Sequence, residues 1–123
     1  MNLDPYIRQC QVIRVIDADT LRLRIDLGWN QFSDHNVRLL RVNAPELKGD
    51  TREAGLDSKM WVINWLQEKA LDESITAWPF IIHSQKSDSF GRYLGEIYSL
   101  NGDNLNDDLI KSGHGIPFTV TRG

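Results

Sequence analysis

The clearest pattern in the chain is an alternation of apolar and polar residues over positions 20–27. Leucine or isoleucine stands at every second position, and arginine and aspartate lie between them, as in a strand that buries one face. Residues 11–16 form a second run, which is apolar and β-branched. The Asp17-Ala18-Asp19 segment between the runs predicts a tight turn, because aspartate side chains bond nearby backbone groups. The two runs are therefore expected to pair.

A third strand is expected at Val37–Val42. Pro45 would end it, because proline has no N–H to donate to a sheet ladder. Gly28–Asp34 is interpreted as the loop before this strand, with an exposed Trp29.

The chain between residues 50 and 70 has the spacing of an amphipathic helix. Asp50, followed three residues later by Glu53, resembles a capping box. Gly55 weakens the prediction slightly, because glycine is a poor helix former. Apolar residues then recur at spacings of three and four, which predicts a buried stripe. Its members are Leu56, Met60, Ile63, Leu66 and Ala70, widened by Trp61 and Trp65.

Two more strands and a short helix follow. Ile75–Ser84 and Tyr93–Leu100 are expected strands, although Pro79 restricts part of the first to a sheet edge or a bulge. Leu105–Ser112 is the expected helix, with Asn104 as its N-cap and acidic residues in its first turn. Residues 116–123 have no strong pattern.

Five strands with a helix between the third and fourth favour a small closed barrel. The expected class is α+β, mainly β: a five-stranded oligonucleotide-binding (OB-fold) barrel with a short C-terminal helix. Residues 1–123 are expected to form one domain, since this is a typical domain length. Periodicity alone does not distinguish this barrel from another α+β sheet.

The composition changes this picture little. The chain is 41% apolar and 25% charged, as in ordinary globular proteins. Its net charge of −3 argues against tight, nonspecific coating of nucleic acid but allows a local basic groove. One cysteine, Cys10, excludes an intrachain disulfide. Neither a signal peptide nor an apolar span of roughly 18 residues is visible, so a cytoplasmic monomer with no membrane contact is expected.

Three short segments carry candidate chemistry: residues 15–21, 38–46 and 88–92. Asp17 and Asp19 stand two residues apart at a turn, where their oxygens can hold a hard cation. A lone Asp-x-Asp is more often a solvated turn. Arg38 lies among apolar strand residues, and it therefore needs a polar partner or an anion.

The end of the third expected strand adds more oxygen donors. Asn43 offers an amide oxygen, Ala44 a backbone carbonyl and Glu46 a carboxylate. Gly91 permits a close backbone approach and can set Arg92 against a phosphate. Each segment alone is compatible with an ordinary turn. Together they supply a cation site, a base and two guanidinium groups, which is the chemistry of phosphodiester cleavage.

In this order, Asp17–Thr20, Arg38–Glu46 and Phe90–Arg92 resemble the staphylococcal nuclease-like (thermonuclease) family, over roughly residues 10–115. The resemblance implies an OB-type barrel and calcium-dependent cleavage of DNA, RNA or both, with departure of the 5′ oxygen. It makes Asp19 a direct calcium ligand, Ala44 a carbonyl ligand and Asp17 an outer-shell carboxylate. Asn43 stands where the family typically has an aspartate ligand, so calcium binding is expected to weaken.

The resemblance also assigns the catalytic groups. Glu46 matches the general base for the attacking water, and Arg38 and Arg92 match the arginines that stabilise the phosphate in its transition state. All three side chains are expected to face a groove rather than the core. Phe90 replaces the usual tyrosine and Ser89 a frequent basic residue.

Two alternatives stay open. The first is a catalytically weak or inactive nucleic-acid-binding domain on the same barrel, which Asn43 and Phe90 favour. The second is a protein-interaction module, which the acidic net charge favours.

Overall fold

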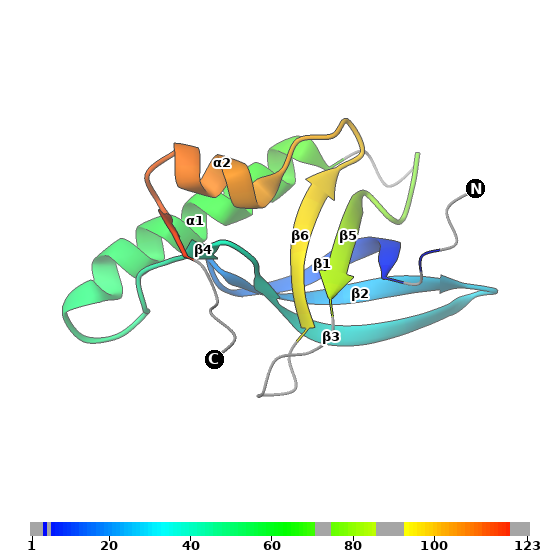
Figure 1. The fold of residues 1–123 in the computed structure, drawn as a ribbon, viewed down its shortest axis with the longest axis horizontal. Helices are drawn as coiled ribbons and strands as arrows, with labels where there is room; N and C mark the ends of the chain where they lie inside the picture. Colours follow the sequence, from blue (N-terminus) through cyan, green and yellow to red (C-terminus); the bar gives the residue numbers. More distant parts are fainter. Residues whose placement is uncertain (1–3, 5, 71–74, 86–92, 119–123) are drawn as a thin grey trace.

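The described strands form a closed barrel in the order β1-β2-β3-β6-β5 (Figure 1). The structure is a computed structural model that describes residues 4, 6–70, 75–85 and 93–118. Neighbouring barrel strands are antiparallel, except that β3 and β6 run parallel. The barrel strands are β1 (Ile7–Asp17), β2 (Thr20–Gly28), β3 (Gln31–Leu39), β5 (Phe80–Gln85) and β6 (Tyr93–Ser99).

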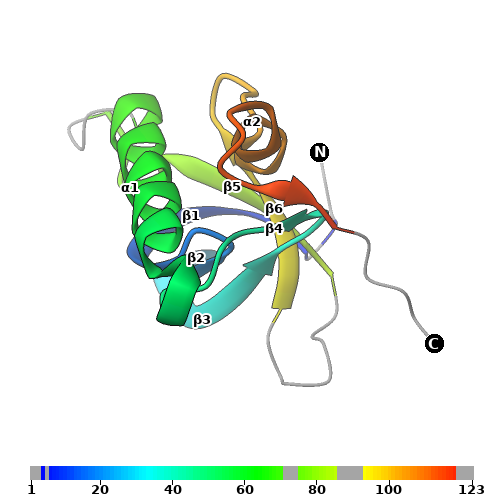
Figure 2. The ribbon, with the colours of Figure 1, turned by 90° about the vertical axis from the view of Figure 1, so that its left-hand side faces the viewer.

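Two helices complete the predicted architecture. α1 (Arg52–Lys69) lies between β3 and β5 in the chain, and α2 (Leu105–Lys111) follows β6. Figure 2 shows α1 running along one flank of the barrel, with α2 beside its upper part. A 3-10 turn at Gly49–Thr51 precedes α1, and β4 (Val42–Asn43) pairs with β7 (Ile116–Pro117). The α+β OB-fold class is confirmed.

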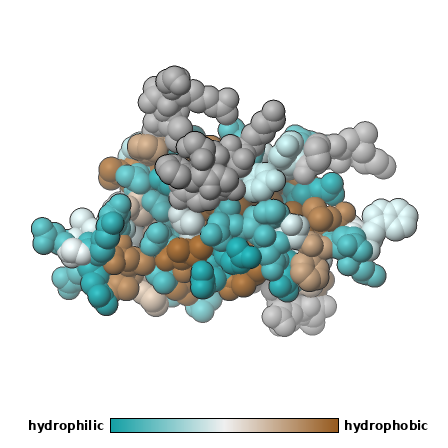
Figure 3. All heavy atoms as spheres, turned by 90° about the horizontal axis from the view of Figure 1, so that it is seen from below, coloured by the Kyte–Doolittle hydropathy of each residue, from teal (hydrophilic) through white to brown (hydrophobic). Residues whose placement is uncertain are grey.

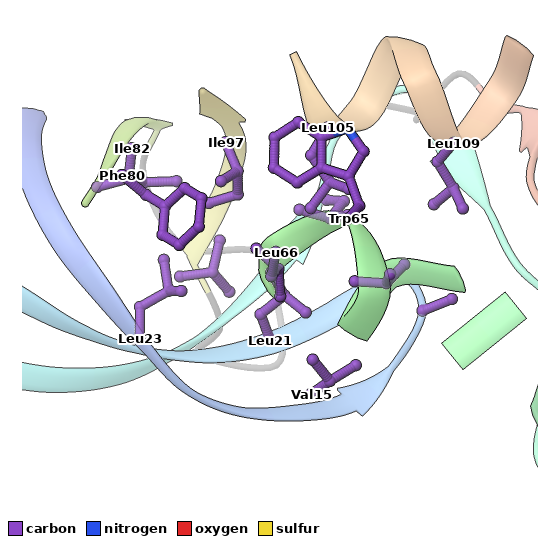
Figure 4. Packing of buried hydrophobic residues seen from close by; sticks show 14 of the residues in the cluster. Val15, Leu21, Leu23, Trp65, Leu66, Phe80, Ile82, Ile97, Leu105 and Leu109 are labelled. Atoms are coloured by element: carbon purple, nitrogen blue, oxygen red, sulfur yellow. The ribbon is translucent and has the colours of Figure 1, made fainter. Parts of the chain in front are cut away.

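The barrel interior is filled by aliphatic and aromatic side chains that meet both helices. Leu21 and Leu23 are fully buried, which confirms the first half of the predicted apolar face of β2, whereas Leu27, near the hairpin tip, is exposed. Burying such a side chain stabilises the fold by roughly 1.5–3 kcal/mol. Figure 4 shows these leucines facing a group contributed by α1, β5, β6 and α2: Trp65, Leu66, Phe80, Ile82, Ile97, Leu105 and Leu109. Cys10 belongs to this core, and burial raises the pKa of its thiol to about 12.

The predicted loop at Gly28–Asp34 is wrong. β3 begins at Gln31, so the turn is only Trp29 and Asn30, each with a φ of 57°. The first half of β3 was missed because its side chains are mostly polar on both faces of the strand, which hides the alternation. Trp29 is 96% exposed, as expected.

The third strand also ends earlier than predicted, at Leu39. The chain turns at Arg41, whose φ is 67°, before β4 begins. Asn106, fully buried at the start of α2, donates to the carbonyls of Leu40 and Gly95 and so fixes this turn against β6. A buried asparagine paired in this way stabilises one backbone path.

α1 starts and faces differently from the prediction. Asp50 does not cap it: the N-cap is Thr51, whose hydroxyl donates to the carbonyls of Glu46 and Lys48. Leu56 and Met60 are exposed, and so is Ala70, which lies just past the end of the helix as its C-cap. The buried positions of the helix are Gly55, Ser58, Val62, Trp65 and Leu66. Small residues near the start of α1 let it approach neighbouring backbone, and hydrophobicity alone could not predict that.

The later elements follow the sequence more closely. β5 begins at Phe80, directly after Pro79, while Ile75 is exposed and lies outside the strand. α2 is capped as predicted, since the side chain of Asn104 accepts the Asp107 N–H at 3.0 Å. Within the described residues, no helix is both long and apolar enough to cross a membrane.

Candidate active site

The predicted oxygen donors gather around one hollow of about 230 Å³. It lies where the β1–β2 turn, the end of β3 and the segment after β4 meet. The residues that line it are Asp17, Asp19, Thr20, Arg38, Asn43, Ala44, Pro45 and Glu46. Residues from two of the three predicted segments therefore come together.

Asp19 is the most firmly held of the carboxylates. One of its oxygens accepts the Ala44 N–H at 3.0 Å, and the other accepts the Thr20 hydroxyl at 3.2 Å. Its backbone carbonyl accepts the Leu39 N–H at 2.8 Å. These bonds join the β1–β2 turn to the end of β3 and to the segment after β4, and they orient the carboxylate.

Most of the hydrogen bonds that Arg38 can donate go to other groups of the protein. Its Nη1 donates to the carbonyls of Leu39 and Val42, both at 2.8 Å. Its Nη2 donates to Asn43 Oδ1 at 3.0 Å and lies 3.5 Å from Asp19 Oδ2. The side chain is 14% exposed. The polar partner predicted for Arg38 therefore exists, but the residue is less open to a groove than expected.

Three carboxylates share this region. Burial raises the pKa of Asp17, and the negative charges of Asp19 and then Glu46 raise it further, while Lys59 and Arg38 oppose the shift. Neighbouring negative charges repel, and a cation among them would relieve that repulsion.

The Glu46 side chain faces solvent, while its backbone packs against α1. The side chain is 71% exposed, with Lys48 Nζ at 3.6 Å. A Cβ on Gly55 would lie 2.7 Å from the Glu46 carbonyl oxygen and 2.9 Å from that of Pro45. Gly55 therefore allows α1 to pack directly under this segment, and it explains the glycine that weakened the helix prediction.

The donor set suits a hard cation of modest affinity. Carboxylate, amide and carbonyl oxygens are the ligands that calcium prefers, and its affinity rises with ligand charge. Asn43 stands beside Asp19 where a further carboxylate would add charge. Among the described residues, no three His, Cys, Asp or Glu side chains gather closely enough to form a metal site. A cation here would depend on Asp19 together with the neutral oxygens of Asn43 and Ala44.

Several predicted residues lie outside this geometry. Ser89, Phe90, Gly91 and Arg92 lie outside the described residues. The structure does add an aromatic side chain: Arg38 Cζ lies 5.8 Å from the centre of the Phe118 ring.

The positioning residues Gly55, Thr51 and Asn106 were not identified as such from the sequence. A glycine within an otherwise good helical pattern was the one available signal for the first of them.

The fold and the hollow define a small OB-type barrel protein with an acidic, arginine-bordered site at the end of β3. The chain belongs to the family described as staphylococcal nuclease homologue, whose model matches residues 36–121.

Curated relatives carry nuclease names. Two proteins named "Uncharacterized endonuclease", from Escherichia coli O157:H7 and Escherichia coli, are each 25% identical over 103 residues, which is 84% of this chain. "Endonuclease YhcR" of Bacillus subtilis (strain 168) is 31% identical over 109 residues. The chain spans 56% of the length of the Escherichia coli relatives and 8% of the Bacillus protein.

Proposed function

We propose that this chain is a metal-dependent nuclease that hydrolyses phosphodiester bonds of DNA, RNA or both, with calcium as its metal. The observation that carries the proposal is the single hollow lined by Asp19, Arg38, Asn43, Ala44 and Glu46. Family membership and the endonuclease names of the relatives support the same reaction class.

In this proposal, different residues would bind the cation and activate the attacking water. Asp19, the Asn43 amide and the Ala44 carbonyl would hold the cation, and Asp17 would act in its outer shell. When bound, calcium supplies positive charge that polarises a phosphoryl oxygen. Glu46, exposed at the rim, takes a proton from the attacking water.

The two arginines would donate hydrogen bonds to the phosphate. Arg38 uses both Nη1 hydrogens on the Leu39 and Val42 carbonyls and one Nη2 hydrogen on Asn43 Oδ1, so its Nε–H and second Nη2 hydrogen would reach the phosphate. Arg92 would supply the second guanidinium. Donors fixed before the reaction stabilise developing charge most effectively.

Chelation tests the proposal most directly. Incubation with single-stranded DNA should give cleavage in calcium and none in excess chelator, because the site would lose its positive charge. Gel analysis of end-labelled DNA measures this. Cleavage that continues undiminished in chelator would contradict the metal mechanism.

Replacing Asn43 by aspartate should tighten calcium binding severalfold, because it adds a charged oxygen next to Asp19. Arg38 Nη2, which now donates to Asn43 Oδ1 at 3.0 Å, would retain its acceptor. Calorimetric titration of both proteins measures the change. Equal or weaker affinity in the variant would mean that residue 43 does not face the ion. The rate need not rise, since tighter ground-state binding alone does not accelerate chemistry.

Nucleic-acid binding without cleavage is the second candidate. The reduced ligand charge at Asn43 favours it, because too weak a cation site would leave the barrel as a binding module. Calcium concentrations raised well above the measured Kd separate the two: an enzyme regains cleavage, whereas a binding module does not.

A further inference from the structure

We propose that two copies of this chain form a two-fold dimer through the tip of the β2–β3 hairpin, with Trp29 of each copy seated in a hollow beside the hairpin of the other. The tip comprises residues 27–33, and the hollow lies at the end of the barrel from which the hairpin projects. This interaction surface is independent of the proposed nuclease chemistry, and it differs from the monomer expected from the sequence.

The end of the hairpin projects from the barrel. β1 and β2 pair only as far as Cys10 and Ile25, and β3 pairs with β6 only over residues 37–39. Beyond these points the hairpin pairs with no further strand among the described residues. Figure 1 shows its tip reaching past the rest of the barrel. A two-stranded ribbon is marginally stable by itself, so contacts with another surface would stabilise it.

The tip is apolar, exposed and uncharged. Residues 27–33 contain no Asp, Glu, Lys or Arg. Trp29 is 96% exposed, Phe32 54% and Leu27 43%. Figure 3 shows this end of the molecule on the right, where hydrophobic side chains lie close to the projecting tip. Exposed strand ends normally carry charges that prevent association, and this one lacks them. Because the tip has no cation to offer a polyanion, a protein surface suits it better.

Trp29 also occupies an unfavourable backbone conformation. Trp29 and Asn30 are the two central residues of the turn, each with a φ of 57°. This region suits glycine and asparagine, whereas bulky aromatic residues are uncommon there. Such strain persists where another interaction compensates for it, and it clusters at functional positions. An indole ring left in water gives no compensation, but one buried in an interface does.

The hollow has the size and the lining for an aromatic ring. Its volume is about 120 Å³, somewhat less than the ~150 Å³ of an engineered cavity that holds benzene, so it takes part of an indole ring. Ile25 and Ile82 supply its apolar surface. The rings of His35 and Tyr93, whose centres are 5.0 Å apart, add aromatic surface. Aromatic rings attract one another beyond the area that they bury.

The hollow also offers an acceptor for the indole N–H. Ser84, which lines it, donates its hydroxyl hydrogen to the Tyr6 carbonyl at 3.0 Å. A hydroxyl oxygen has two lone pairs, and these can accept a hydrogen bond from the Trp29 side chain. A buried tryptophan usually needs such a partner for its N–H.

The register of the hairpin gives both contacts to one partner. Leu27 lines the hollow together with Ile25, and Trp29 follows Leu27 by two residues. Two residues of strand span about 7 Å, so Leu27 lies midway between Ile25 and Trp29. A two-fold axis beside Leu27 would set the hairpins antiparallel and place each Trp29 at the partner's Ile25. Because the tip and the hollow share one face, the contact closes into a dimer rather than continuing into a filament.

The area involved suits a weak dimer. An exposed tryptophan can bury about 150–250 Å². Two-fold symmetry doubles this burial, and it adds the rim of each hollow, where Leu27 and Tyr6 are both exposed. The total approaches the roughly 1,000 Å² that a specific interface needs. We therefore expect association in the micromolar range or weaker.

The dimer would leave both candidate active sites open. Thr20, which lines the candidate active site, and Gly28 are the two ends of β2. The strand between them is about 27 Å long. Cleavage per chain should therefore not depend on association, and the dimer and the nuclease proposal can fail separately.

Sedimentation velocity at micromolar to millimolar concentrations tests the dimer. The parent should pass from monomer to dimer as its concentration rises. Trp29→Gly should weaken association about tenfold or more, because buried tryptophans are frequent hot spots. At concentrations where both proteins are monomeric, this variant should unfold at the same or a higher temperature, because glycine suits the turn. Trp29→Phe should retain part of the association, since it keeps an aromatic ring.

Met60→Ala is the matched control. Met60 is 51% exposed on α1 and does not belong to the hairpin or to the hollow. Its removal deletes an exposed apolar side chain of the same kind, and it should leave association unchanged.

Engineered cysteines test the position of the axis. Leu27→Cys should form an intermolecular disulfide under mild oxidation, because the axis brings its two copies together. Phe32→Cys is the control: Phe32 pairs with Asp26 on the opposite face of the hairpin, and it should cross-link little. Cys10 does not interfere, because it is fully buried and its thiol pKa is raised to about 12. Electrophoresis without reductant measures the cross-linked fraction.

Three results would overturn the dimer: a parent that sediments as a monomer at every concentration, undiminished association in Trp29→Gly, or an equal loss in Met60→Ala. Equal cross-linking of the two cysteine variants would overturn the two-fold arrangement. A monomeric parent whose binding to single-stranded DNA or to phosphatidylcholine vesicles is lost in Trp29→Gly would assign the tip to another partner instead. A parent that dimerises but cleaves no DNA in calcium would contradict the nuclease proposal alone.

Discussion

Replacing Glu46 by glutamine should lower kcat by about 10²-fold or more while the protein stays as stable as the parent. Glutamine keeps the shape of the side chain but cannot take a proton from water, and a positioned base typically contributes that much to a rate. The side chain is 71% exposed, with Lys48 Nζ at 3.6 Å. A surface ion pair of this kind contributes little to stability.

Lys48→Ala is the matched control, because it removes the neighbouring charge and leaves the carboxylate. Its kcat should stay within a few-fold of the parent. Single-turnover kinetics in saturating calcium, with thermal unfolding of each variant, measures both effects. A Glu46→Gln protein that cleaves at the parent rate would show that another group, or bulk water, acts as the base.

Regular alternation predicted those parts of the fold in which one strand face is apolar and the other polar. β2 matches its prediction to within a residue, because Leu21 and Leu23 enter the core while its arginines do not. The N-cap of α2 could also be predicted from the sequence, because the Asn104 side chain bonds a backbone N–H within the first turn of the helix.

Features that depend on contacts between distant segments could not be predicted from the sequence in this way. Gly55 and Ser58 are buried because α1 packs closely on the Pro45–Glu46 backbone and on His114, whose carbonyl accepts the Ser58 hydroxyl at 2.7 Å. Hydrophobicity ranks Leu56 above both residues, yet Leu56 is exposed. Helix orientation follows how near two backbones can come, and a one-dimensional apolar stripe does not contain that information.

The candidate site shows the same division. Residue type and the order of the motifs were enough to suggest that Asp19, Asn43 and Glu46 share one region, although Asp19 lies in the β1–β2 turn while Asn43 ends β4 and Glu46 follows it. The spacing did not reveal that Arg38 stabilises the β3–β4 turn. That role depends on the positive φ of Arg41, which turns the chain so that the Val42 carbonyl accepts a hydrogen bond from Arg38 Nη1.

The net charge of −3 likewise hides a local arrangement. Acidic residues cluster at the hollow and in the first turn of α2, while the outer face of the β2–β3 hairpin carries arginines and aspartates together. The net charge therefore does not describe the charge at any one surface, because contacts are set by charge within about one Debye length.

The double role of Arg38 leads to the second large effect. Arg38→Ala should lower kcat by about 10²-fold or more, through loss of a preorganised donor to the phosphate. It should also destabilise the fold by about 1–3 kcal/mol, because the Leu39 and Val42 carbonyls and the Asn43 amide lose their donor. This replaces the simpler expectation that a groove-facing arginine can be removed without cost to the fold.

Arg38→Lys separates the two contributions. A lysine ammonium retains the positive charge near Asp19 but cannot reproduce a planar fork that contacts three acceptors. We expect it to recover part of the stability and little of the rate. Denaturant unfolding gives the first quantity, and single-turnover cleavage, measured where each variant is fully folded, gives the second. Full recovery of the rate by lysine would mean that only charge is required, and an alanine variant as active as the parent would leave Arg38 a purely structural residue of the β3–β4 turn.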